Sequence, residues 1–346
     1  MGSGGGAVED VEGMTPQSGF GWTGKRALVT GATGMVGSWL CRRLLDEGAQ
    51  VVALVRDADP QSELVRSGTL AQVGVVSGRI EDYRTVERAI NDHEVDTVFH
   101  LAAQTIVGAA VRSPLPTLEA NVMGTCNVLE AARAHQGLVR RVVVASSDKA
   151  YGPQKELPYT EDTPLVGRSP YEVSKSAADL ITQAYHSTFA VPAAIARCGN
   201  IFGGGDLNWS RIVPGSVRAL YHGDPMVIRS DGLFLRDYIF VEDVVDAYLV
   251  LAELLADEEV AGRAFNFSGE APLTVLAMYD AVCRALAVPR PEPVVLGGAA
   301  DEIRDQYLDS SLSRNVLGWR PRHSLESGLD LTVRWYLDLF DTKGGM

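Results

Sequence analysis

The residues Arg26-Ala-Leu-Val-Thr-Gly-Ala-Thr-Gly-Met-Val-Gly37 decide the fold of this chain. A short apolar run at 26–30 leads directly into a turn rich in glycine, and a helical pattern follows to about residue 47. Glycine lets the backbone turn sharply and approach a ligand, and the N-terminus of a helix attracts negative charge. This order predicts that a dinucleotide lays its pyrophosphate on the turn. The residues expected to hold it are Gly31, Thr33, Gly34, Met35, Val36 and Gly37.

Further strand-like runs follow, each after a helical stretch, at 50–55, 71–76, 97–101 and 141–145. Short β-branched runs separated by helices predict an α/β fold, a doubly wound parallel sheet of the Rossmann type. Beyond Cys198 the pattern becomes irregular, which favours a smaller C-terminal α/β substrate lobe. The expected organisation is a flexible leader at 1–21, a dinucleotide-binding domain at 22–199 with a helix at about 238–257 returning to it, and a substrate-binding lobe at 200–237 and 258–346.

Composition excludes several classes of protein. The chain has 346 residues and a net charge of −13, so a nucleic-acid-binding surface is not expected. No apolar run approaches the roughly 20 residues of a membrane span. The four cysteines (Cys41, Cys126, Cys198 and Cys283) are scattered, which favours reduced thiols in a cytoplasmic protein. No His or Cys spacing predicts a metal site.

A second motif carries chemistry. Tyr171 and Lys175 are four residues apart and therefore share one face of a helix. A nearby ammonium favours a phenolate, so Lys175 is expected to lower the pKa of Tyr171, and Ser147 to hold the same substrate hydroxyl. These three residues predict removal of a proton from an alcohol while a nicotinamide takes the hydride. Asp148 and Lys149 follow the serine directly and add an acid and a second potential base.

The choice between NAD and NADP depends on the end of the second expected strand. An acidic residue there normally holds the ribose 2′-hydroxyl, but this chain has Val55-Arg56-Asp57. An arginine matches the geometry of a 2′-phosphate. We therefore expect NAD(P), with a preference for NADP through Arg56.

The glycine spacing, the Tyr171/Lys175 pair and the chain length resemble the extended short-chain dehydrogenases/reductases, in particular the nucleotide-sugar epimerase/dehydratase family. The resemblance covers about 25–336. It implies that His100-Leu-Ala-Ala103 passes under the cofactor and that Asn121 anchors a helix near the active site. It further implies a homodimer, in which two helices at about 114–135 and 171–189 pair with those of a second subunit. It also implies cofactor contacts from Ile80, Leu101, Ala102 and Ala103, and a nucleotide-diphosphate hexose held by Gln104, Asn121, Asn200, Arg211, Arg236 and Arg304.

Within that family, an acid and a base after the serine are typical of 4,6-dehydratases, and lysine as the second residue resembles the CDP-glucose branch, with GDP-mannose 4,6-dehydratases also similar. The resemblance implies that Asp148 protonates the departing C6 hydroxyl and that Lys149 takes the C5 proton, unless Lys149 contacts phosphate. A 4-epimerase or a uronate decarboxylase working through the same 4-keto intermediate is the alternative. A catalytically silent sensor of the dinucleotide is an alternative of another class. The nucleotide base, the hexose and the pathway stay open.

Overall fold

A computed structural model of the chain describes residues 20–57, 59–298 and 302–343, so the expected leader lies almost entirely outside the described residues. Seven parallel strands form one sheet in the order β11-β6-β5-β4-β1-β2-β3. This is the doubly wound Rossmann order, which confirms the expected fold class. The strands are β1 (Arg26–Thr30), β2 (Gln50–Val55), β3 (Gly74–Ser77), β4 (Thr97–His100), β5 (Arg141–Ala145), β6 (Ala193–Cys198) and β11 (Ala264–Phe267).

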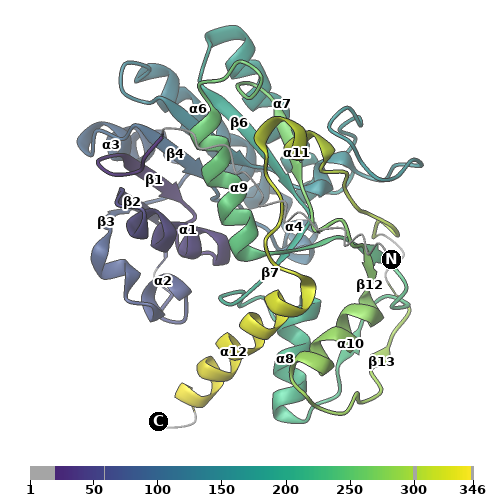
Figure 1. Cartoon of the computed structure of the whole chain (residues 1–346). Helices are drawn as coiled ribbons and strands as arrows, with labels where there is room; N and C mark the ends of the chain where they lie inside the picture. Colours follow the sequence, from purple (N-terminus) through teal and green to yellow (C-terminus); the bar gives the residue numbers. More distant parts are fainter. Residues whose placement is uncertain (1–19, 58, 299–301, 344–346) are drawn as a thin grey trace, which may run out of the picture.

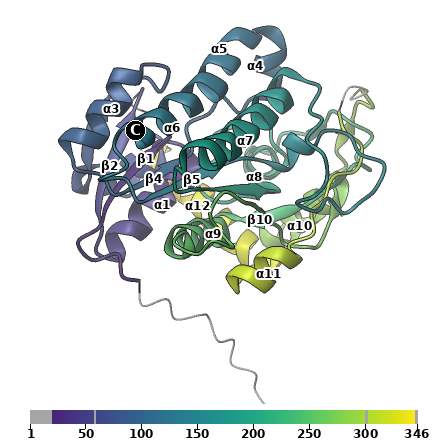
Figure 2. The same cartoon turned by 90° about the horizontal axis from the view of Figure 1, so that it is seen from above.

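Helices cover both faces of the sheet (Figure 2). Alternate residues of a strand point to opposite faces, so Val29 packs with one set of helices and Leu28 with the other. The first set contains α1 (Met35–Asp46) and α9 (Val241–Leu254). The second set contains α3 (Tyr83–Asp92), α6 (Gly124–Ala134) and α7 (Pro170–Phe189). Because both faces are buried, the inner strands are apolar almost throughout.

A smaller lobe lies below the sheet in Figure 1 and has its own core. Three helices, α8, α10 and α12, pack around the rings of Phe202, Phe240 and Tyr336. The lobe elements are α8 (Ile212–His222), α10 (Val275–Ala285) and α12 (Leu325–Lys343), with the strand pairs β7 (Asn200–Phe202) and β10 (Tyr238–Phe240), β8 (Val227–Ile228) and β13 (Val294–Val295), and β9 (Leu235–Arg236) and β12 (Leu273–Thr274).

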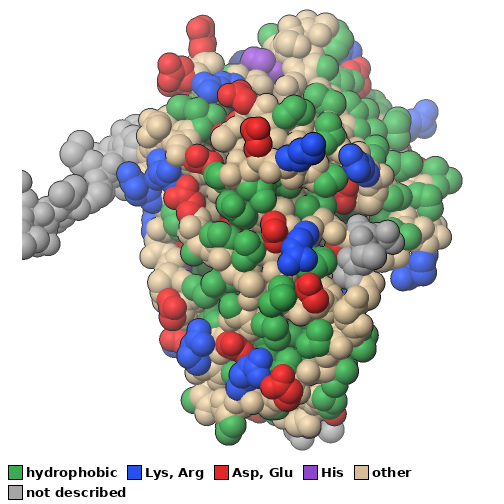
Figure 3. Space-filling view, turned by 90° about the vertical axis from the view of Figure 1, so that its right-hand side faces the viewer, with side chains coloured by type: hydrophobic (Ala, Val, Ile, Leu, Met, Phe, Trp, Pro, Cys, Tyr) green, Lys and Arg blue, Asp and Glu red, His purple; other side chains and the backbone are tan. Residues whose placement is uncertain are grey.

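Short helices make up the connections: α2 (Glu63–Arg66), η1 (Thr69–Gln72), α4 (Val107–Arg112), α5 (Pro114–Leu118), η2 (Glu119–Met123), η3 (Asp148–Tyr151) and α11 (Ser311–Leu317). None of the helices within the described ranges is both long and apolar enough to cross a membrane. The face shown in Figure 3 has acidic and basic side chains interspersed, without a basic patch.

Two expected boundaries are wrong. The sequence pattern assigns residues 264–267 to the lobe, but they form β11, the edge strand beside β6. The helix α11, also expected in the lobe, packs against α9 and β11. The expected strand at 71–76 begins later, because residues 69–72 form the 3₁₀ helix η1 and pairing with β2 aligns Val52 with Gly74. The register of the neighbouring strand, rather than the apolar run, fixes where β3 begins.

Candidate active site

The expected site residues meet in one large cavity between the sheet and the lobe. The cavity has a volume of about 1070 Å³ and opens at the carboxyl ends of the parallel strands. Its lining includes every residue expected to hold the cofactor and the five expected catalytic residues, together with Gln104, Asn200, Arg211 and Arg236. In a doubly wound sheet this edge is where ligands bind.

The glycine turn is shaped for a close approach between backbone and ligand. Gly31 has a φ of +71°, and a Cβ there would lie 2.8 Å from the main-chain nitrogen of Ala102. A Cβ on Gly37 would lie 2.2 Å from the carbonyl oxygen of Gly31. The turn therefore stays narrow and presents the N-terminus of α1 to the cavity. These features fit a dinucleotide pyrophosphate, with Leu101, Ala102 and Ala103 lining the cavity beside the turn.

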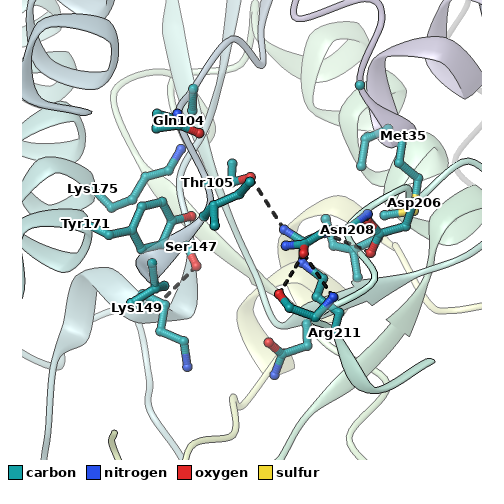
Figure 4. Close-up of a pocket in the computed structure, with 18 of the residues that line it drawn as sticks. Met35, Gln104, Thr105, Ser147, Lys149, Tyr171, Lys175, Asp206, Asn208 and Arg211 are labelled. Atoms are coloured by element: carbon teal, nitrogen blue, oxygen red, sulfur yellow. Dashed lines mark hydrogen bonds and ion pairs between the residues drawn. The ribbon is translucent and has the colours of Figure 1, made fainter. Parts of the chain in front are cut away.

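Tyr171 and Lys175 lie on the first turns of α7, which starts at a capping box formed by Ser169 and Glu172. Ser147 lowers the pKa of the Tyr171 hydroxyl, and Nζ of Lys175 donates to the carbonyl oxygen of Ala145 at 2.8 Å. Figure 4 shows Tyr171 beside Ser147, with the Lys175 side chain next to Tyr171. The geometry is that of a base and an orienting hydroxyl sharing one substrate oxygen.

The electrostatics of Tyr171 differ from the expectation. Burial raises the pKa of Tyr171 to about 12, and the largest opposing effect on that pKa comes from the positive charge of Arg211. Burial also lowers the pKa of Lys175 to about 8. The positive charge that acts most on the Tyr171 phenol in the chain alone is therefore that of Arg211, while Lys175 is hydrogen-bonded to a main-chain oxygen.

Asp148 and Lys149 begin η3, directly after β5 and its following turn. One carboxylate oxygen of Asp148 accepts a hydrogen bond from Oγ of Ser147 at 2.9 Å, and the other, Oδ2, is buried without a partner. Burial lowers the pKa of Lys149, and the charge of nearby Arg236 lowers it further, against the opposing charge of Asp148. Ser147 itself caps η3 by accepting from the main-chain nitrogen of Lys149. Asp148 is therefore not needed as the cap of this turn.

Arginine side chains and one amide reach the cavity from the lobe. Arg236 is buried and donates to the carbonyl oxygens of Leu235 and Arg304, with Glu302 3.4 Å away. Arg211 pairs with Asp206 at 3.0 Å. Nδ2 of Asn200 is buried without a partner. These donors are arranged to receive an anionic ligand such as a diphosphate.

Two expected substrate residues lie outside the cavity lining. Asn121 is fully buried, with Oδ1 accepting from the main-chain nitrogen of Gln104 and Nδ2 donating to Ser174, so it ties the loop after β4 to α7. The side chain of Arg304 is 63% exposed, and its guanidinium faces Asp231 and Asp305. The main-chain oxygen of Arg304 orients Arg236 instead.

Sequence reasoning assigned no role to several residues of the site. Gln306 is fully buried and contacts Asp148 and Lys149. Arg211 also lies 3.5 Å from Thr105, so it bridges the two sides of the cavity (Figure 4). Asp206, Asn208, Arg229 and Glu302 complete the lining on the lobe side. Long-range pairing of this kind leaves no local pattern in a sequence.

Within the described ranges, no group of three His, Cys, Asp or Glu side chains could hold a metal ion.

Comparison with known proteins identifies the family. The model of the "NAD dependent epimerase/dehydratase family" matches residues 27–268. The chain belongs to this family. It is 32% identical over 333 residues to the CDP-glucose 4,6-dehydratase of Salmonella typhimurium, covering 91% of each chain.

Solved structures of epimerase/dehydratase proteins have the same fold. The dTDP-glucose 4,6-dehydratase of Streptomyces venezuelae, solved with NAD bound, aligns with a TM-score of 0.80 and 28% identity, covering 90% of this chain and 97% of that one. The UDP-glucose 4-epimerase of Thermotoga maritima, solved with UDP-glucose, aligns with a TM-score of 0.82 and 26% identity, covering 91% and 99%. Both a dehydratase and an epimerase therefore share this architecture.

The glycine turn gives a first testable prediction. In Gly37→Ala the new methyl group would collide with the carbonyl oxygen of Gly31, so the turn must open. We expect the affinity for the dinucleotide to fall by about 10-fold or more, equivalent to about 1.4 kcal/mol, as measured by isothermal titration calorimetry. Gly137→Ala is the matched control, because a Cβ there meets nothing within 4 Å. Unchanged affinity in Gly37→Ala would contradict the proposed role of the turn.

Proposed function

We propose that this protein is a nucleotide-sugar 4,6-dehydratase, which converts a nucleotide-diphosphate hexose into its 4-keto-6-deoxy derivative. The observation that supports this most is that Asp148 and Lys149 line the cavity beside Ser147 and Tyr171. A 4-epimerase only removes and returns hydrogen at C4, so it has no use for an additional acid and base. The 32% identity to a CDP-glucose 4,6-dehydratase supports the same proposal.

Oxidation at C4 is the task of Ser147 and Tyr171. Both side chains meet at one point of the cavity, where they would hold the C4 hydroxyl and Tyr171 would take its proton. When bound, the nicotinamide accepts the hydride from C4 and returns it at C6. Lys175 supports the site from behind Tyr171 and would bind the nicotinamide ribose. Burial raises the pKa of Tyr171 to about 12 in the chain alone, so nearby positive charge, such as that of Arg211, favours this step.

Elimination of water is the task of Asp148 and Lys149. The new C4 carbonyl acidifies the C5 proton, which the neutral amine of Lys149 takes. The electrons of the broken C5–H bond form the C5=C6 double bond, and the C6–O bond breaks. Asp148 supplies the proton with which the C6 oxygen leaves as water, through its buried Oδ2. Lys149 then returns its proton to C5 as C6 is reduced, so the product has lost one water and no net electrons.

The diphosphate of the substrate would be held by Arg236, Arg211 and Asn200. In the structure the two arginines face the carboxylates of Glu302 and Asp206. A diphosphate oxygen can replace each carboxylate as an acceptor of charge-assisted hydrogen bonds. Incubation with CDP-, dTDP-, GDP- and UDP-hexoses, with mass spectrometry of the products, identifies the base and the reaction. A loss of one water means a dehydratase, and unchanged mass with altered stereochemistry means a 4-epimerase.

The preference for NADP stays a prediction that depends on Arg56. Its guanidinium lines the cavity and pairs with Asp57 at 2.6 Å, and both side chains are exposed. Arg56 would meet a 2′-phosphate, whereas Asp57 offers an acceptor to a free 2′-hydroxyl. A cytoplasmic location is likewise part of this proposal and is supported by four cysteines that form no disulfide.

A homodimer is also proposed, through α7 and the segment α5-η2-α6, which pack side by side. Five large apolar side chains on these elements are exposed: Leu115, Met123, Val173, Leu180 and Phe189. Helical spacing in the sequence predicts that Leu118, Val122, Leu129, Ala177, Leu180, Ile181 and Ala184 face this interface. Of these, Leu129 instead belongs to the core between the sheet and these helices, and Ile181 packs against that core. Pairing across a two-fold axis would bury the exposed residues as a four-helix bundle.

The dimer gives a prediction on solution behaviour. Light scattering at micromolar concentration should report twice the mass of the 37.2 kDa chain. Leu180→Glu places a charge in the proposed interface and should shift the protein toward monomer. Leu296→Glu, at an equally exposed leucine of the lobe, is the control and should leave the dimer intact. A monomeric wild type would contradict the proposed pairing.

The cofactor preference gives a third prediction. If Arg56 binds a 2′-phosphate, Arg56→Ala should weaken NADP by roughly 1.5–3 kcal/mol, the range for hydrogen bonds to charged groups, and barely affect NAD. Titration calorimetry with each dinucleotide measures both affinities. Equal weakening of the two, or none, would show that the pocket is built for NAD.

The sharpest prediction separates oxidation from elimination. Tyr171→Phe removes the base for the first step, so neither reduced dinucleotide nor product should form. Asp148→Asn keeps the shape but removes the transferable proton, so water loss should slow by about 10²–10⁴ while oxidation at C4 survives. Absorbance of the reduced dinucleotide in single-turnover experiments follows the first step, and mass spectrometry follows the second.

Lys149→Met distinguishes the two roles considered for that side chain, the base for the C5 proton and a phosphate contact. As the C5 base, its loss should give the same pattern as Asp148→Asn, whereas loss of a phosphate contact should mainly raise KM. Full dehydration by Asp148→Asn would show that Asp148 is not the acid of the elimination, whereas a wild type that changes stereochemistry without losing water would favour the 4-epimerase.

A further inference from the structure

Gln306 is buried at the point where the lobe meets η3. It is fully inaccessible to solvent, and its main-chain nitrogen donates to the carbonyl oxygen of Leu235 at 3.1 Å. A short β-bridge places it beside Arg236, the proposed phosphate residue. Its position is therefore fixed by the backbone of the lobe, although it lies 157 residues from Lys149 in sequence.

The carboxamide of Gln306 contacts both members of the Asp148/Lys149 pair. Its Nε2 donates to the main-chain carbonyl oxygen of Asp148 at 2.8 Å, and its Oε1 accepts from Nζ of Lys149. A carbonyl oxygen only accepts, so the amide must turn its nitrogen toward Asp148. Oε1 is then the atom that faces Lys149. The chemistry of the two partners thus sets the orientation of the amide.

An uncharged acceptor has a particular consequence for an amine. Oε1 holds one N–H of Lys149 and has no proton to donate, so it cannot occupy the lone pair of the neutral amine. That lone pair stays free for a proton of the substrate. A carboxylate at the same place would also fix the amine but would stabilise the ammonium. Glutamine therefore positions the amine without adding a negative charge.

We infer that Gln306 is a positioning residue that keeps Lys149 directed at the C5 proton of the substrate and available as a neutral base. The inference depends on the proposed dehydratase reaction, in which Lys149 takes that proton. Burial of Lys149 and the charge of Arg236 act in the same direction, since both disfavour the ammonium. Gln306 touches no reacting atom in this scheme and acts through Lys149.

The direct test measures the titration of Lys149 and needs no turnover. Reductive methylation of the whole protein with formaldehyde proceeds only on the neutral amine, and peptide mass spectrometry gives the rate at Lys149 as a function of pH. In the wild type the midpoint should lie below the roughly 10.4 of a free lysine. In Gln306→Glu it should move upward by about one pH unit or more, because the carboxylate stabilises the ammonium. An unmoved midpoint in Gln306→Glu would overturn the inference.

The kinetic test separates positioning from general structural damage. Gln306→Met keeps the length of the side chain but loses both hydrogen bonds, so dehydration should slow by about 10–100-fold. The KM should stay within about threefold, and oxidation at C4 should be retained. Gln306→Glu should recover dehydration as the pH rises, following the labelling midpoint. Dehydration by Gln306→Met at the wild-type rate would overturn the inference.

Controls separate this inference from the proposed function. Gln154→Met removes another amide that donates to main-chain oxygens, those of Tyr151 and Pro164, but does not contact Lys149. It should leave both the labelling midpoint and the pH profile unchanged. If the wild type removed no water from any nucleotide hexose, the proposed function would fail, while the labelling midpoint in Gln306→Glu would still decide whether Gln306 controls Lys149.

Discussion

A buried ion pair between β6 and α7 holds the catalytic segments in register. Arg197 of β6 and Asp179 of α7 form two parallel hydrogen bonds of 2.8 and 2.9 Å, and both side chains are almost inaccessible to solvent. Arg197 also donates to the hydroxyl of Tyr151, at the end of η3, and that hydroxyl donates to Asn266 of β11. Asn266 in turn donates to the carbonyl oxygens of Tyr159 and Asp309. One network therefore connects the helix of Tyr171 and Lys175, the turn of Asp148 and Lys149, and the segment that contains Gln306. Charges buried this deeply require complete pairing, which fixes the geometry of all three segments together.

The same principle explains how an acidic protein can offer a site to an anion. The chain has a net charge of −13, so its long-range field repels a diphosphate. Arg236 lies in a buried position where the screening by water is weak, and its guanidinium is oriented by two main-chain oxygens rather than by an ion pair alone. Among the residues that the structure describes, the carboxylate paired with it is that of Glu302, which is half exposed and 3.4 Å away. Local geometry, and not net charge, thus determines where the diphosphate would bind.

Much of the fold could be predicted because local patterns specify it, whereas the site depends on contacts between distant segments. The runs that became β1, β2, β4 and β5 are apolar and β-branched, and the glycine turn is contiguous in sequence. The strands β6 and β11 carry Arg197 and Asn266 in the core, so their apolar pattern is interrupted and β11 was placed in the wrong lobe. Asn121 and Arg304 were assigned to the substrate from a resemblance, but their side chains point to Ser174 and to Asp231. The dominance of burial in the pKa values of Tyr171 and Lys175 could not be predicted either, since no sequence pattern reports burial at a particular atom.

A lysine can act as the base of an elimination only while its amine is neutral. The groups around Lys149 can be understood from this requirement. Asp148 next to it favours the ammonium, and a bound diphosphate would favour it further. The positive charge of Arg236 opposes both effects, because it disfavours a second cation nearby. A bound diphosphate would neutralise part of that charge. The hydrogen-bond partner of the amine then determines its protonation, since a carboxylate in that place would stabilise the ammonium of Lys149. With the uncharged amide of Gln306 as acceptor, proton transfer from C5 starts from a free lone pair on Lys149.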